Sequence, residues 1–288
     1  MSQERTAELD GALLLRGWAA MESVRATPAV RADIAWAART DIGRHRENNE
    51  DKFDFFLPDD PMALAMRGRL WAVADGMGGH SAGQIASEAA LKALVRSYYA
   101  ETTADAPEAL RAALTDANAL IHQASKQFEN TGGMGTTLVA AVVRDDTVMV
   151  AHVGDSRAYL LREGERLRQI TTDHSWVEEQ VRRGALSREQ AEASPYRNYI
   201  TRSVGVLDTV DPDVVTETLR PGDLLLMCSD GLTGYVDGDA LEAILRRSQN
   251  PSRLVLDLID AANDAGGRDN ITALVLAVRA VEPWREPA

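Results

Sequence analysis

Apolar side chains that recur every three or four residues predict two long helices in the first half of the chain. The first helix follows a capping signature at Ser81 and Gln84, and the second follows Pro107. A third helix is predicted to begin at Asn250, because a capping residue there precedes a proline. The apolar faces of the first two carry Leu91, Leu94, Val95 and Tyr98, and Leu110, Ala113, Leu114, Ala117 and Ile121.

Shorter apolar runs bounded by turn residues predict strands over the rest of the chain. The run at 271–278 is apolar on both faces, which is typical of a central strand. Because hairpins link the strands and helices come between groups of strands, βαβ alternation does not fit. The pattern predicts antiparallel sheets packed together and covered by helices. The predicted strands lie at about 33–41, 69–75, 134–143, 147–153, 158–161, 166–170, 211–219, 223–228 and 271–278.

The same pattern divides the chain into an N-terminal arm (residues 1–30), one domain (31–282) and a short tail (283–288). Residues 171–205 are polar and partly helical, and we expect this segment, called the flap below, to lie over a sheet edge and face substrate. The arm is interpreted either as a terminal helix packed on the domain or as a partner-binding or regulatory element. One helix face in the arm carries Leu14, Trp18 and Met21.

Composition and charge narrow the class of protein. The 288 residues are 45% hydrophobic and 26% charged, as in ordinary globular proteins. A formal net charge of −13, without a basic block, argues against nucleic acid or an anionic membrane as a partner. The single cysteine, Cys228, cannot form an internal disulfide and lies in a predicted buried strand. No apolar run reaches membrane-spanning length, so we expect a cytoplasmic protein. A monomer is expected as its oligomeric state.

Acidic residues stand beside small residues at the ends of several predicted strands. Asp75 follows the run Leu70-Trp71-Ala72-Val73 and precedes three glycines within four residues. Similar acids are Glu50, Asp155, Asp230 and Asp269. We expect these carboxylates to converge, and converging carboxylates repel one another unless cations lie between them. The pattern therefore predicts a site for hard divalent metals such as Mg²⁺ or Mn²⁺.

Six motifs in order resemble those of the metal-dependent protein serine/threonine phosphatases, the protein phosphatase 2C family in its compact bacterial form. The resemblance runs from about residue 34 to 280. It implies an α+β fold, a four-layer α/β/β/α sandwich of two antiparallel β-sheets flanked by helices, with a two-metal cleft at one end. The motifs span residues 40–51 (TDIGRHRENNED), 74–80 (ADGMGGH), 133–137 (GMGTT), 154–157 (GDSR), 228–232 (CSDGL) and 267–270 (GRDN).

The resemblance also implies roles for the acids. Asp75 corresponds to the residue that bridges two Mn²⁺ or Mg²⁺ ions. Glu50 and the backbone carbonyl of Gly76 correspond to ligands of one ion, and Asp230 and Asp269 to ligands of the other. A glycine suits position 76 because its carbonyl must turn inward without a side chain in the way.

Four further residues take roles from the same resemblance. Asp155 resembles the acid that binds a third, weaker metal together with Asp230. Arg46 matches an arginine that binds the phosphoryl group, and a guanidinium can hold two phosphate oxygens at once. Asp51 and Asn270 flank ligand acids and are expected to orient them or their waters.

The proton donor to the leaving group is not assigned by the sequence. Many eukaryotic members of the family carry histidine where this chain has Met77, and a thioether cannot donate a proton. His80 is a candidate donor through a water molecule, and a structural role near the start of a helix is the alternative. The other histidines, His45, His122, His152 and His174, show no metal-type spacing, and His152 is expected in the core.

The function predicted from these residues is hydrolysis of phosphoserine and phosphothreonine in proteins by a metal-activated water, without a covalent phosphoenzyme. The resemblance implies phosphorylated proteins as substrates and a cognate serine/threonine kinase and its targets as partners. A two-metal phosphodiesterase or nuclease is the alternative enzyme, which the negative charge disfavours. A non-catalytic adaptor would lack metal ligands that this chain retains. No Cys-x5-Arg motif surrounds Cys228, which argues against a thiol phosphatase.

Overall fold

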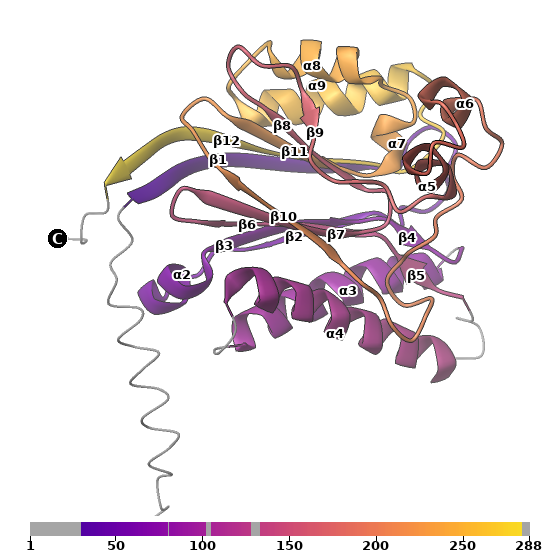
Figure 1. The fold of residues 1–288 in the computed structure, drawn as a ribbon, viewed down its shortest axis with the longest axis horizontal. Helices are drawn as coiled ribbons and strands as arrows, with labels where there is room; N and C mark the ends of the chain where they lie inside the picture. Colours follow the sequence, from indigo (N-terminus) through magenta and orange to yellow (C-terminus); the bar gives the residue numbers. More distant parts are fainter. Residues whose placement is uncertain (1–29, 80, 102–104, 128–132, 284–288) are drawn as a thin grey trace, which may run out of the picture.

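The computed structural model describes residues 30–79, 81–101, 105–127 and 133–283. Two five-stranded antiparallel sheets lie face to face, and helices cover the outer face of each sheet (Figure 1). The four-layer α/β/β/α sandwich predicted from the sequence is therefore confirmed. The arm before Val30, the tail after Pro283 and His80 lie outside the described residues.

The first sheet has the strand order β1-β12-β11-β8-β9, with every neighbouring pair antiparallel. The last strand of the chain pairs with both β1 and β11, as its apolar faces predict. The strands are β1 (Val30–Asp41), β8 (Arg157–Leu161), β9 (Arg168–Gln169), β11 (Leu224–Cys228) and β12 (Ile271–Pro283).

The second sheet has the order β10-β7-β6-β3-β2 and is also antiparallel. A short two-stranded sheet, β4 with β5, extends from its end. The strands are β2 (Lys52–Phe56), β3 (Arg69–Ala74), β4 (Gly76–Met77), β5 (Gly135–Thr136), β6 (Leu138–Arg144), β7 (Thr147–Val153) and β10 (Asp213–Thr218).

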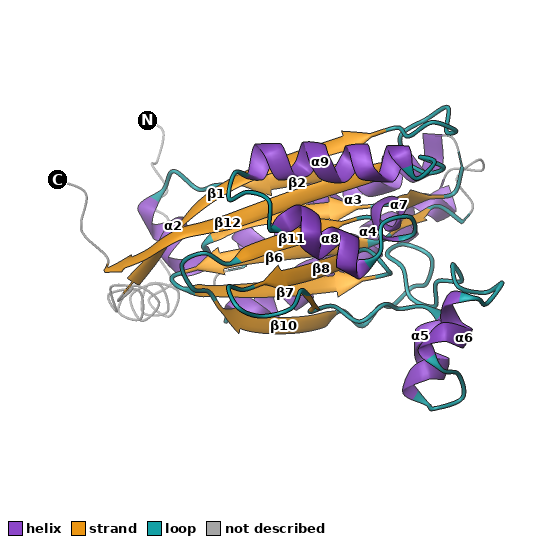
Figure 2. Cartoon of the chain, turned by 90° about the horizontal axis from the view of Figure 1, so that it is seen from above, coloured by secondary structure: helices purple, strands orange, loops and turns teal. Residues whose placement is uncertain are grey.

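Helices α3 (Ser81–Ala100) and α4 (Ala106–Gln127) pack on the second sheet, and α8 (Gly238–Leu245) and α9 (Pro251–Asp264) pack on the first (Figure 1). The apolar faces predicted for α3 and α4 are buried at Leu91, Leu94 and Leu110, among others. The flap carries two short helices that project from one end of the sandwich (Figure 2). The remaining helices are α2 (Pro61–Arg67), α5 (Trp176–Arg182), α6 (Arg188–Glu192) and α7 (Asp230–Thr233).

Three apolar clusters fill the spaces between the layers. The central cluster lies between the two sheets and contains Trp71, Leu225 and Leu274. One outer cluster joins the second sheet to α3 and α4, and the other joins the first sheet to α7, α8 and α9. Burial of this apolar area is the main force that holds the four layers together. Cys228 and His152 are buried, as predicted.

Several short elements are absent from the sequence prediction. Strand β2 forms a sheet edge where Phe55 and Phe56 remain exposed, so the alternation that marks a half-buried strand is lost. Helix α2 has a local signal, because Asp60 caps it and Pro61 occupies its first turn. Helix α8 begins after Asp237, which caps it through the backbone N–H of Ala240. In the part of the chain that the structure describes, no helix has the length and apolarity needed to cross a membrane.

Candidate metal centre

One end of the sandwich gathers acids from strands of both sheets. β3, β7 and β11 run toward this end. Each is followed within two residues by an acid, which is Asp75 after β3, Asp155 after β7 and Asp230 after β11. β2 and β12 run away from it, and Glu50 and Asp269 precede them by two residues. These five residues are called the carboxylate cluster below. Antiparallel pairing places the acids of each sheet at one end, and the face-to-face packing of the two sheets brings the two groups together.

The backbone of Asp75 is fixed by two threonines of the neighbouring segment. Its N–H donates to Oγ1 of Thr137 over 3.0 Å. Its carbonyl accepts from Oγ1 of Thr136 and from the N–H of Thr137, each over 2.8 Å. Oγ1 of Thr137 lies 2.7 Å from Oγ of Ser156, beside Asp155. The Gly135-Thr136-Thr137 segment thus holds Asp75 at the strand end.

Glu50 lies in a cradle made by two glycines and an asparagine. Its N–H donates to Oδ1 of Asn270 over 2.8 Å, and Nδ2 of Asn270 donates to the carbonyls of Ile42 and Asn48. A Cβ at Gly83 would lie 1.9 Å from the Glu50 carboxylate, and one at Gly76 would lie 2.8 Å from the Glu50 carbonyl. Only glycine therefore leaves room for this carboxylate.

Arg46 joins the carboxylate cluster directly. Its Nη2 donates to Oδ2 of Asp269 over 2.7 Å, and the side chain is about half exposed. The hydrogen bond to Asp269 raises the pKa of Arg46, and the charges of Glu50 and Asp75 raise it further. The arginine that the sequence assigns to phosphate binding thus faces three of the acids.

Asp51 lies behind the cluster and is fully buried. Its Oδ2 accepts from the hydroxyls of Ser229 and Thr272, each over 2.7 Å, and its Oδ1 has no hydrogen-bond partner. Burial raises the pKa of Asp51 to about 6, although the two hydroxyls oppose the shift. Ser229 immediately precedes Asp230, so Asp51 ties the start of β2 to the end of β11.

The cluster is electrostatically strained without a cation. Burial raises the pKa of Asp75 well above its ordinary value, and the charges of Asp51 and Asp230 raise it further. Burial also raises the pKa of Asp230, with repulsion from Asp269 as the next cause. Burial and the charge of Asp230 raise the pKa of Asp155 to about 8. Simultaneous ionisation of these four neighbouring carboxylates is therefore unfavourable. They are Asp51, Asp75, Asp155 and Asp230.

The donor set fits hard divalent cations. Its atoms are carboxylate oxygens, and Oδ1 of Asp155 is buried without a hydrogen-bond partner. Positive charge placed among these groups would relieve their repulsion and restore the ionised form. Mg²⁺ and Mn²⁺ prefer such oxygen ligands.

Comparison with known proteins decides the family. The family model described as protein phosphatase 2C matches residues 44–257. The serine/threonine phosphatase stp of Listeria monocytogenes is 40% identical over 243 residues, which are 83% of this chain and 93% of that protein. The chain belongs to the protein phosphatase 2C family. The resemblance stated from the sequence motifs is therefore confirmed.

Solved structures of relatives agree with this membership. Stp1 from Staphylococcus aureus is 33% identical and superposes with a TM-score of 0.78, covering 86% of this chain and 96% of that one. The catalytic domain of the phosphatase PstP, described as a complex with two manganese ions, is 35% identical with a TM-score of 0.72. It covers 85% of this chain and 98% of that domain. Binding of divalent metal by this family is thus represented among the relatives.

A second cluster of possible metal ligands lies at the base of the flap, although sequence spacing gives no sign of it. Atoms of His152, His174 and Asp213 lie within 4.8 Å of one another. The N–H of Gly154 donates to Nδ1 of His174 over 3.1 Å, so a neutral ring carries its proton on Nε2, which faces Asp213 at 3.4 Å. A metal would need the lone pair of that Nε2. The geometry therefore fits a hydrogen-bonded anchor better than a cation site.

The proton donor remains without structural support. His80 lies outside the described residues, so its role stays a prediction. Met77 is half-buried in β4. The residues that sequence reasoning misses are the hydroxyl partners of Asp51, because serine and threonine carry no spacing signal of their own.

Proposed function

We propose that this chain hydrolyses phosphoserine and phosphothreonine residues of proteins by attack of a metal-activated water. The observation that carries the proposal is the convergence of five strand-end acids, with Arg46 bonded to one of them. Family membership and the names of the relatives support the same reaction. Phosphate monoesters are anionic and hydrolyse very slowly alone, so a site that gathers cations suits this chemistry.

The roles of the acids follow the sequence proposal. Asp75 would contribute to both metal positions, as the family resemblance implies. Its buried carboxylate lies close enough to Asp230 and Asp269 for their charges to raise its pKa. Glu50 and the carbonyl of Gly76 would complete one position, and Asp230 with Asp269 the other. When bound, two divalent cations neutralise phosphoryl charge and lower the pKa of a bound water.

Asp155 is proposed as a ligand of a third, weaker metal. Burial and the charge of Asp230 raise the pKa of its carboxyl group, and its Oδ1 is buried without a hydrogen-bond partner. Both Mn²⁺ and Mg²⁺ suit these donors. Asp51 and Asn270 are proposed to orient the ligands that they flank, through the hydrogen bonds described above.

Arg46 is proposed to hold the substrate phosphoryl group. Its half-exposed guanidinium reaches the cluster from the solvent side and can exchange the Asp269 oxygen for two phosphate oxygens. This exchange would hold the phosphoryl group beside the acids. His80 is proposed to relay a proton to the leaving oxygen through water.

A cysteine nucleophile does not fit this chain. Burial raises the pKa of Cys228 to about 12, so its thiol stays protonated and is shielded from substrate. Water is therefore the proposed nucleophile, and no covalent phosphoenzyme is proposed. The proposed partners are phosphorylated proteins and a cognate serine/threonine kinase, for a monomeric cytoplasmic enzyme.

The test is release of phosphate from a phosphothreonine peptide, with Mn²⁺, with Mg²⁺ and with excess chelator. We expect turnover with either metal and none with chelator. A matching phosphodiester serves as the second substrate and should react far more slowly. Turnover that survives complete chelation would overturn the mechanism, and preference for the diester would favour the phosphodiesterase alternative.

A further inference from the structure

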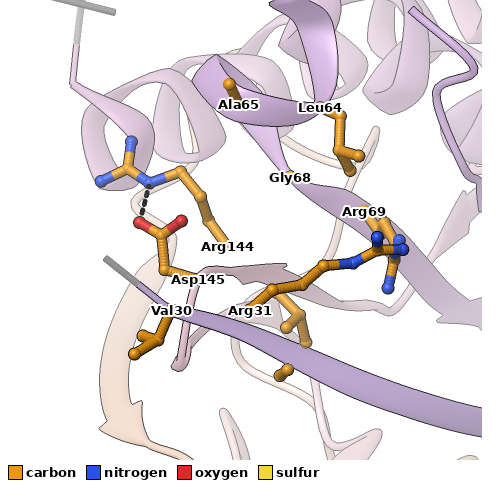
Figure 3. A pocket seen from close by; sticks show the side chains of 10 residues that line it. Val30, Arg31, Leu64, Ala65, Gly68, Arg69, Arg144 and Asp145 are labelled. Atoms are coloured by element: carbon orange, nitrogen blue, oxygen red, sulfur yellow. Dashed lines mark ion pairs between the residues drawn. The ribbon is translucent and has the colours of Figure 1, made fainter. Parts of the chain in front are cut away.

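Arginines gather around a small cavity at the end of the sandwich opposite the carboxylate cluster. Arg31 is the second residue of β1, Arg69 begins β3, and Arg144 ends β6 (Figure 3). The cavity encloses about 30 Å³, which is room for two or three water-sized groups. Asp75 follows the far end of β3, so six residues at about 3.3 Å each separate this cavity from the cluster by roughly 20 Å.

Two of these guanidinium groups lie near each other, and in the part of the chain that the structure describes neither forms an ion pair. Figure 3 shows the side chain of Arg31 extending toward that of Arg69. Burial lowers the pKa of Arg69, and the charge of Arg31 lowers it further, whereas Asp33 opposes the shift only weakly. Arg69 is half-buried and Arg31 is exposed. The repulsion between Arg31 and Arg69 costs free energy unless an anion lies between them.

The acids near the cavity form no ion pair with these two arginines. Glu282 lies opposite Arg31 across β1 and β12, and Asp33 acts on Arg69 only from a distance. Asp145 lies 3.8 Å from Nε of Arg144 and is thereby engaged by a different arginine (Figure 3). Among the residues that the structure describes, no carboxylate lies within 4.0 Å of either Arg31 or Arg69. By contrast, Arg166 elsewhere in the chain contacts two acids. The lack of a partner is unexpected in a chain whose net charge is −13.

We propose that Arg31 and Arg69 bind a small phosphate-type dianion at this cavity, at a site separate from the catalytic centre. Two guanidinium groups supply two positive charges and two planar sets of N–H donors, which a tetrahedral oxyanion can accept at once. The cavity can receive two or three oxygen-sized groups of an oxyanion, and because it opens to solvent the rest of the anion can remain hydrated. The bound group is either inorganic phosphate or the phosphate of a phosphorylated side chain.

The test measures binding of inorganic phosphate by titration calorimetry to the full chain with excess chelator. An Arg46→Ala background removes the arginine proposed for the catalytic cleft, so the result does not depend on turnover or on the proposed reaction. We expect one phosphate per chain with a Kd of roughly 1 mM. Arg31→Gln and Arg69→Gln should each weaken binding at least about tenfold, because each removes half of the donor set.

Arg247→Gln is the matched control, because Arg247 is exposed and its replacement removes one positive charge, as Arg31→Gln and Arg69→Gln do. It should bind phosphate as tightly as the parent. Without phosphate, Arg31→Gln should unfold at a Tm no lower than that of the parent, because repulsion is relieved. A merely structural arginine would lower that Tm. Absence of saturable binding in the parent, or equal weakening by Arg247→Gln, would overturn the proposal.

A phosphothreonine peptide that is not hydrolysed under chelation then distinguishes the two sources. Competition between the peptide and phosphate identifies a phosphorylated side chain as an accepted ligand. Binding of phosphate without such competition identifies the free ion. Both results support an oxyanion site. In both cases the proposal requires that Arg69→Gln loses binding of the ligand.

Discussion

Replacement of Asn270 by alanine should separate positioning of a metal ligand from general stability. The side chain is buried, accepts from the N–H of Glu50, and donates to the carbonyls of Ile42 and Asn48. Asn270→Ala deletes all three hydrogen bonds. At about 1 kcal/mol each, the free energy of unfolding should fall by about 3 kcal/mol. Folded domains have about 5–15 kcal/mol, so the variant should still fold.

The same change should weaken metal dependence. The segment 42–50 that carries Glu50 would lose its attachment to the start of β12, so this carboxylate would no longer be fixed. Loss of such supporting groups costs about 10-fold to 100-fold in metal affinity. The measurement is the Mn²⁺ concentration for half-maximal phosphate release, combined with urea unfolding of the metal-free protein.

Asn250→Ala is the matched control, because Asn250 caps α9 through the N–H of Ser252, away from the acids. It should lose about 1 kcal/mol and keep the parent's metal requirement. The reasoning about Asn270 fails if Asn270→Ala lowers the free energy of unfolding no more than Asn250→Ala does and needs no more Mn²⁺ than the parent for half-maximal activity.

Three further predictions concern the cluster itself. Asp75→Asn should lower kcat by about a thousandfold, equivalent to about 4 kcal/mol, in a protein that still folds, and near-normal kcat would contradict its bridging role. Asp155 has a pKa raised to about 8, so the folded state binds more protons than the unfolded state between about pH 4 and 8. Metal-free protein should therefore lose stability to urea as pH rises from 6 to 8, and a gain would refute this. Gly83→Ala should displace Glu50 and raise the Mn²⁺ requirement in phosphate-release assays, whereas Gly238→Ala, with open space at its Cβ, should leave it unchanged.

The fold and the acids could be predicted because each leaves a local record in the sequence. A strand-end acid beside glycine, as in Asp75-Gly76, places a carboxylate where the chain leaves a sheet. Antiparallel pairing brings such ends together within each sheet, and the packing of one sheet on the other then joins the two groups. The long apolar faces of α3 and α4 were equally visible, since a buried helix face needs a regular spacing.

The supporting groups could not be predicted, because their partners are distant in sequence and common in composition. Oδ2 of Asp51 accepts from Ser229 and Thr272, which lie 178 and 221 residues away. Strand β2 escaped prediction for a related reason, since its edge position leaves Phe55 and Phe56 exposed. Chemistry that depends on contacts between layers needs the structure.

The two charged ends of the sandwich follow from one physical rule and differ in how visible they are. At one end, acids crowd together and burial raises the pKa values of Asp75 and Asp155, so the cluster favours cations. At the other end, Arg31 and Arg69 crowd together, so the cavity favours an anion. A glycine adjoins Asp75, Asp155 and Asp230 in the sequence, whereas two arginines 38 positions apart in a chain rich in arginine carry no such mark. Like charges left close together without an ion-pair partner therefore indicate a ligand that sequence motifs do not mark.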